Sequence, residues 1–202
     1  MTKVRPFLLT VLTGCLVLLT ASVPTVRAQA APAAAGRLPF DAVLVLSPEF
    51  CATTFKQGSM WTTGGETFNV GKMACAELEP ALKPAYADLT VAAAPPASVN
   101  AHFVLIPSFA SAHATTSAFA FSNREMDVFL EWTVKDPAGK TVWLQTVQGS
   151  SKHHMGNMFT HSHDVKLIVK DSVKDVAAQS AARMEAAPEL RALSSQHASA
   201  AK

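Results

Sequence analysis

The sequence is poor in charged residues and lacks the short motifs that mark common catalytic sites. Asp, Glu, Lys and Arg make up only 16% of its 202 residues, and lysine and arginine form no run. Without a basic cluster interleaved with aromatic residues, the sequence gives no indication of nucleic-acid binding. No GxSxG, HExxH, phosphate-loop or dinucleotide-binding motif occurs either. The enzyme classes that these motifs identify therefore receive no support.

The first 28 residues predict an export signal. Lys3 and Arg5 precede an apolar run from Phe7 to Val23, and small residues follow up to Ala28. This order is typical of a secretory signal peptide, and we expect cleavage after Ala28, with Ala30 as a second suitable position. The segment carries three positive charges and no acid, so its removal changes the formal net charge from +2 to −1. The chain is expected to be periplasmic or secreted, with a nearly neutral domain.

Two alternatives for this leader stay open. Leu12-Thr13-Gly14-Cys15 resembles the lipobox of bacterial lipoproteins, which would make Cys15 the acylated first residue of the mature protein. The apolar run continues well past Cys15, which favours the signal peptide instead. The run is also close to the minimum of about 17 residues for a membrane span, so an uncleaved anchor is the second alternative. We expect membrane contact only if the chain is lipidated at Cys15 or keeps its leader.

The rest of the chain predicts one domain with two irregular ends. Residues 29–39 are mostly alanine and proline, a composition typical of an unstructured linker. Residues 40–193 are long enough for a single α+β domain with its own core. The small and polar residues 194–202 predict a disordered tail.

Hydrophobic periodicity predicts the order strand, helix, three strands, helix within this domain. Strands are predicted where apolar runs or period-two alternation occur, at 42–46, 101–106, 124–136 and 141–148. Residues 108–122 fit a loop or a strand extension. Helices are predicted from about Gly65 to Leu82, where Thr63 and Glu66 have capping-box spacing, and from about Asp164 to Pro188. The expected fold is an α+β sandwich, a mostly antiparallel sheet with two helices on one face.

A segment rich in histidine and methionine follows the last predicted strand. Imidazole and thioether groups together suit copper, and imidazole alone suits zinc. The six candidate ligands are His153, His154, Met155, Met158, His161 and His163. In an extended segment His161 and His163 would share a face and an ion. The competing interpretation is a solvated polar loop, because no acidic or cysteine ligand completes a recognisable zinc pattern.

Cys51 and Cys75 are the only cysteines that follow the leader. An exported protein with an even number of cysteines favours a disulfide, which here would tie the end of the first strand to the first helix. Closing a loop of this length stabilises a fold by about 3 kcal/mol in the chain-entropy estimate. The alternative is two separately buried thiols. A catalytic role is not indicated, since neither cysteine has an adjacent histidine or a CxxC context.

The element order resembles that of small bacterial envelope proteins of the LPS-assembly outer-membrane lipoprotein type and of the YajG-like lipoproteins. The strand at 42–46, the helix at 65–82, the hairpin from Met126 to Gln148 and the final helix ending near Leu190 carry this resemblance. It implies a non-enzymatic accessory or assembly factor. This chain differs from those families in lacking a well-placed lipobox.

Three functions remain for the structure to address. The first is an exported, non-enzymatic envelope accessory or interaction protein, whose partner is an envelope protein or a lipid-associated component bound through a sheet edge or a helix face. The second is a periplasmic copper or zinc protein that uses residues 153–163; no other cofactor is expected. The third is a hydrolase, since a triad assembled in space is not visible in one sequence.

Overall fold

The computed structural model describes residues 37–57, 66–96, 101–116, 123–154 and 161–193. Every described residue belongs to one unit of the chain, Ala31–Lys202. The predicted export signal, its alternatives at Cys15 and the predicted tail lie outside these ranges and stay predictions. Within the described ranges, no helix combines the length and the apolar character needed to cross a membrane.

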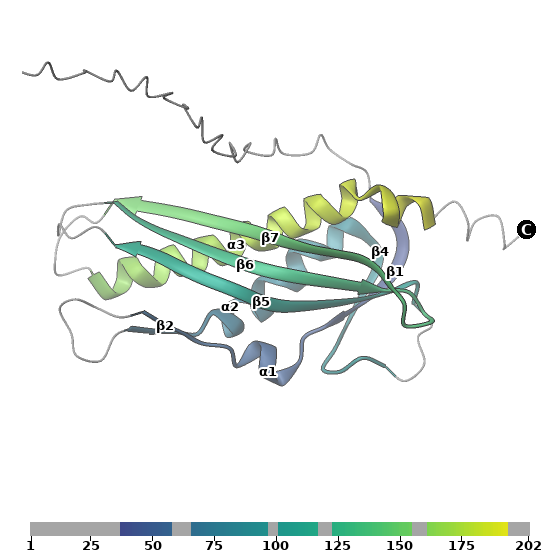
Figure 1. Ribbon diagram of the computed structural model, residues 1–202, viewed down its shortest axis with the longest axis horizontal. Coiled ribbons are helices and arrows are strands. Elements are labelled where there is room, and N and C mark those ends of the chain that lie inside the picture. The colour runs from purple at the N-terminus through teal and green to yellow at the C-terminus, as the bar shows by residue number, and fades with distance from the viewer. Residues whose placement is uncertain (1–36, 58–65, 97–100, 117–122, 155–160, 194–202) are drawn as a thin grey trace, which may run out of the picture. The chain divides into compact units, whose positions relative to one another are not determined.

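A five-stranded mixed sheet with helices on one face forms the domain (Figure 1). In chain order the elements are β1 (Leu38–Val45), α1 (Pro48–Cys51), β2 (Phe55–Gln57), β3 (Glu66–Phe68), α2 (Val70–Leu82), η1 (Lys83–Ala85), β4 (Tyr86–Ala92), β5 (Phe103–Thr116), β6 (Asn123–Lys135), β7 (Thr141–His154) and α3 (His161–Ala186). The strand order is β4-β1-β5-β6-β7, and β2 and β3 form a separate two-stranded sheet. The predicted α+β class is confirmed.

The long strands β5, β6 and β7 form an antiparallel meander. Alternation along β6 decides which face is covered: Val128, Leu130 and Trp132 are buried, whereas Glu131 between them is exposed. The turn between β6 and β7 contains Gly139 at φ 82°, a conformation that favours glycine. The predicted hairpin is confirmed, and β7 extends six residues further than expected, to His154.

The N-terminal half is built differently, because β1 is parallel to both of its neighbours, β4 and β5. Parallel strands need a crossover connection, and the chain from β1 to β4 supplies it through α2. Strand β4 was not predicted. Its two buried residues, Tyr86 and Leu89, are three positions apart, so the segment lacks the alternation that indicates a strand.

Two predicted boundaries are wrong for identifiable reasons. Helix α2 begins at Val70 and not near Gly65, because residues 66–68 pair with β2 and place Phe68 in the core. Asn69 is the N-cap, and its side chain makes no capping hydrogen bond. Helix α3 begins at His161, and a further helical stretch at 188–193 starts at Pro188, a residue suited to a first helical position.

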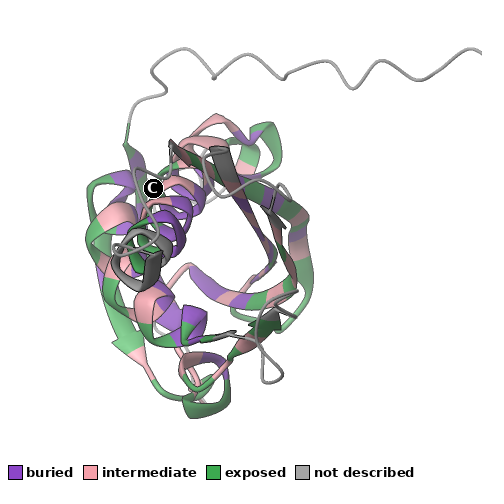
Figure 2. Ribbon diagram, turned by 90° about the vertical axis from the view of Figure 1, so that its left-hand side faces the viewer, coloured by how far each residue is buried: buried purple, intermediate pink, exposed green. Residues whose placement is uncertain are grey.

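Helix α3 lies close to β7 because small residues line the contact. An added Cβ at Gly149 of β7 would lie 2.2 Å from the backbone nitrogen of Val176. The buried hydroxyl of Ser180 accepts a hydrogen bond from Trp132 Nε1 at 2.8 Å and donates one to the Val176 carbonyl. Figure 2 shows the sheet curving around α2 and α3 with buried residues on its inner side. This packing sets which side of α3 faces solvent.

Candidate functional site

The predicted disulfide between Cys51 and Cys75 is formed and joins the end of α1 to α2. The backbone that follows α1 also contacts α2, since the Gly71 N–H donates to the Thr53 carbonyl at 3.0 Å. An added Cβ at Gly71 would lie 2.2 Å from the Phe50 carbonyl oxygen. The disulfide therefore lies beside a backbone contact at Gly71 that leaves no room for a side chain at this position. It leaves neither of the described cysteines as a free thiol.

The histidine and methionine segment is not one continuous loop. His153 and His154 are the last two residues of β7, and α3 begins at His161. Met155 and Met158 lie outside the described residues. His161 and His163 would share a face in an extended segment, but both belong to α3, where positions two apart do not share a face.

His153 has a specific partner on α3. Its Nε2 lies 2.9 Å from Oδ2 of Asp171, with both side chains partly exposed. Over the ranges that the structure describes, no three His, Cys, Asp or Glu residues gather closely enough to hold a metal ion. The side chains of most of the six candidate ligands lie outside the description, so the copper or zinc site stays a prediction.

Two acidic residues of α3, Asp171 and Asp175, face strand β7. Asp171 contacts His153, and one turn later Asp175 Oδ2 accepts a hydrogen bond of 2.8 Å from the backbone N–H of Ser150. Their spacing of four residues places them on one side of the helix. Asp171 was overlooked in the sequence, although its spacing from Asp175 marks an acidic side of the helix.

The opposite, solvent-facing side of α3 is basic. Lys166, Lys170 and Lys174 are exposed at intervals of four residues, and Leu167 beside them is 38% exposed. No ion pair joins any of the three lysines to another residue of the described ranges. We call these four residues the lysine ridge. The helix thus sorts its charges, with carboxylates directed to β7 and ammonium groups left in water.

Charged side chains bind backbone groups of both outer strands of the five-stranded sheet. At the β7 edge, Asp175 binds the N–H of Ser150. Arg37 directly precedes β1, and its guanidinium donates to the carbonyls of Tyr86 at 2.5 Å and of Ala87 at 2.6 Å at the start of β4. Charged groups at sheet edges discourage the addition of another strand. Arg37 was not singled out in the sequence, because nothing local indicates that it lies beside β4.

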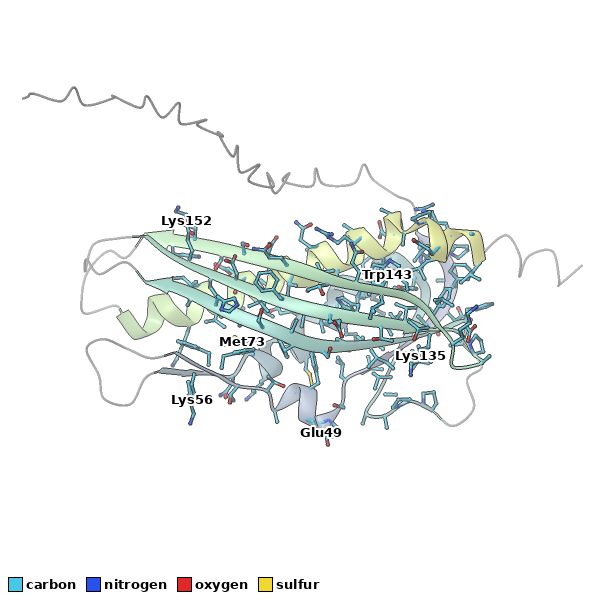
Figure 3. The ribbon with its side chains drawn as sticks, in the orientation of Figure 1. Glu49, Lys56, Met73, Lys135, Trp143 and Lys152 are labelled. Atoms are coloured by element: carbon cyan, nitrogen blue, oxygen red, sulfur yellow. A yellow bond between two sulfur atoms is a disulfide. The ribbon has the colours of Figure 1, made fainter. Side chains whose placement is uncertain are left out.

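The open face of the sheet is mostly polar. Asp127 Oδ1 accepts hydrogen bonds from the Ser150 hydroxyl and from Gln148 Nε2, and Lys152 forms an ion pair with Glu125. Lys152 lies at the end of the hairpin opposite its turn (Figure 3). These contacts stay within the strand pair β6 and β7, as expected for the wet face of a sheet. They do not converge on a common point.

Among the described residues, Tyr86 is the one titratable side chain in the core whose pKa is strongly shifted. Burial raises its pKa, and the negative charge of nearby Glu185 raises the pKa further. The neutral phenol donates a hydrogen bond to the sulfur of Met184 at 3.2 Å. A phenol kept neutral inside the core is a packing group that satisfies its own polar atom.

Comparisons place the fold among bacterial proteins. No protein-family model and no curated protein matches the sequence. The crystal structure of a Xanthomonas campestris protein of the DUF330 family is similar, with a TM-score of 0.58 and 9% identity, covering 82% of this chain and 93% of that one. An Acinetobacter baumannii minor lipoprotein gives a TM-score of 0.44 at 10% identity, covering 77% and 94% of the two chains. A Caulobacter crescentus protein provisionally described as a lipoprotein gives 0.40 at 14% identity, covering 63% and 85%.

At such low identities the likeness to the Xanthomonas protein establishes the fold of this chain and not its activity. The two lipoprotein types named from the sequence stay predictions.

Proposed function

We propose that this chain is an exported, non-enzymatic accessory protein of the bacterial cell envelope, and that it acts by binding another envelope component through the lysine ridge of α3. The leader predicted for residues 1–28 supports export. The disulfide between Cys51 and Cys75 agrees with an oxidising compartment.

The sorting of charge on α3 carries this proposal. A helix that needed charges only for solubility gains nothing from separating them, because mixed charges at spacings of three and four residues stabilise a helix. Here Asp171 and Asp175 contact β7, and the lysines lack described partners. The result is a rigid basic surface that suits an anionic partner.

The β7 edge of the sheet offers a poorer route to a partner than the helix does. The sequence left both a sheet edge and a helix face open as routes, but Asp175 occupies the backbone N–H of Ser150 at the β7 edge. A strand added to that edge would first have to displace this charged side chain. Binding at the lysine ridge requires no such displacement.

Site-specific photo-crosslinking in cells tests the proposal. A photoreactive residue at Lys170 is expected to form an adduct with an envelope component, whereas the same residue at Lys72, exposed on α2, is expected to form none. The chain should fractionate with the envelope and should lack its first 28 residues by intact mass. A full-length cytosolic chain, or equal adduct yields at the two positions, would contradict the proposal.

A further inference from the structure

We infer that the lysine ridge of α3 binds the surface of an anionic phospholipid bilayer. This inference rests on the proposed function and names the partner of that surface. It also gives the folded domain a means of membrane contact that needs neither acylation at Cys15 nor retention of the leader.

The attraction has to be local, because the processed chain has a formal net charge of −1. An anionic surface therefore repels the domain weakly as a whole and attracts it only where lysines face outward. Near an anionic membrane each lysine strengthens binding by about fivefold, so three lysines acting together contribute about 100-fold. Between Lys166 and Asp175 the two acids of α3, Asp171 and Asp175, are each bonded to β7.

Geometry matches the ridge to a flat surface. Lys166, Lys170 and Lys174 lie on successive helical turns, so they span about 12 Å along the axis and about 80° around it. The neighbouring side of α3 is buried, with Val169, Val173 and Val176 at most 1% exposed. The helix is thus held in place before binding, and contact costs little conformational entropy.

Leu167 favours a bilayer over a purely polar anion. It is one of three large apolar side chains that are substantially exposed in the described ranges, the others being Val91 and Leu144. Basic residues beside an exposed apolar residue are typical of helices that lie in the interface of a membrane. The methylene stems of the lysines cover the same boundary while their ammonium groups reach the phosphates. An acidic protein or a nucleic acid would match the charges and leave Leu167 without an apolar environment.

Flotation with vesicles tests the inference. The experiment uses the protein purified from an expressing bacterium, with whatever processing of the leader has taken place there. Vesicles of phosphatidylethanolamine and phosphatidylglycerol in equal parts are compared with vesicles of phosphatidylcholine alone. The wild-type protein is expected to bind the anionic vesicles, to bind the zwitterionic ones much less, and to dissociate as salt is raised. The triple variant Lys166→Gln, Lys170→Gln, Lys174→Gln is expected to lose about 100-fold in partitioning.

A matched variant separates local from total charge. Lys56→Gln, Lys72→Gln, Lys140→Gln removes the same charge from exposed positions elsewhere and is expected to bind as the wild type does. Replacing the three ridge lysines by arginine should preserve binding, and Leu167→Ser should weaken it to a smaller extent. Equal losses in the two glutamine variants, or no preference for anionic vesicles, would overturn the inference. If Lys170 still formed an adduct with an envelope protein in cells, the proposed function would survive without its lipid partner.

Discussion

The two halves of the domain are held together by different means. Between β1 and β4 the elements are short, the strands are parallel, and a disulfide joins α1 to α2. From β5 to α3 the strands are long and antiparallel, and no disulfide occurs among the described residues of this half. Both halves nevertheless contain one contact that only glycine permits, at Gly71 and at Gly149.

The difference follows from how each half closes. A meander pairs neighbouring segments through tight turns, so each new strand forms hydrogen bonds next to its predecessor. A crossover must bring distant segments together before it gains any contact, and this costs loop-closure entropy. A covalent bridge reduces that cost by constraining the unfolded chain. The N-terminal half thus depends on a cross-link where the C-terminal half depends on continuous pairing.

The largest expected effect is on the C-terminal half, from Gly149→Ala. The added methyl group meets backbone atoms of Val176 and Ser172, which cannot move without shifting α3 from the sheet. We expect a loss of about 3 kcal/mol or more in the free energy of unfolding, measured by urea denaturation.

Gly139→Ala in the turn of the same hairpin is the matched control. Nothing lies within 4 Å of its added Cβ, and the only penalty arises from the φ of 82°. That conformation costs about 1–2 kcal/mol for a residue with a side chain. Equal losses at the two glycines would show that α3 does not depend on close contact with β7.

The second prediction concerns the disulfide. The double variant Cys51→Ser, Cys75→Ser is expected to lose about 3 kcal/mol of stability, since the bridge closes a separation of 24 residues. Adding a reductant to the wild type should cause the same loss and should leave the double variant unchanged. If reduction had no effect on the urea midpoint of the wild type, the N-terminal half would not depend on its disulfide.

A smaller effect is expected inside the helix-sheet contact. Ser180→Ala removes the acceptor of the Trp132 N–H and leaves a buried donor without its bond, which costs about 1–3 kcal/mol. Ser172→Ala is the control, because the Ser172 hydroxyl bonds only to the Val169 carbonyl of its own helix. Thermal unfolding followed by tryptophan fluorescence should show the larger shift for Ser180→Ala; the reverse order would contradict this account.

The smallest effect on stability is expected at the sheet edge. Asp175→Ala frees the N–H of Ser150 and should cost less than about 1 kcal/mol, because the bond is exposed to water. Its clearer consequence should be concentration-dependent association in analytical ultracentrifugation, since an uncovered edge accepts another strand. Lys170→Ala, on the solvent side of the same helix, should remain monomeric wherever the wild type does.

The sequence predicted the C-terminal half better than the N-terminal half. Alternation along β6 and the turn at Gly139 are local signals, and both led to the observed hairpin. The segment at 66–68 was assigned to a helix because the capping-box spacing of Thr63 and Glu66 is also local. The pairing of Phe68 with Phe55 prevailed over it.

The candidate surface could be predicted only in part. Lys166, Lys170 and Lys174 have the four-residue spacing of one helix face, which can be recognised in the sequence. The pairing of the two cysteines followed from their number and the expected compartment. The partners of Asp171 and Asp175 could not be predicted, because they belong to β7 and depend on how α3 lies along it.

By itself the sequence determined the class of fold, the meander with its turn, and the amphipathic final helix, because each depends on residues close in the chain. It also determined the pairing of the cysteines, because only two of them follow the leader. Only the tertiary structure decided that β1 is parallel to both neighbours, that Asp175 covers a backbone N–H at the β7 edge, and that α3 leaves three lysines in solvent while Asp171 and Asp175 contact β7. Those outcomes depend on contacts between segments many residues apart, and the packing of Gly149 against Val176 sets the orientation of the helix.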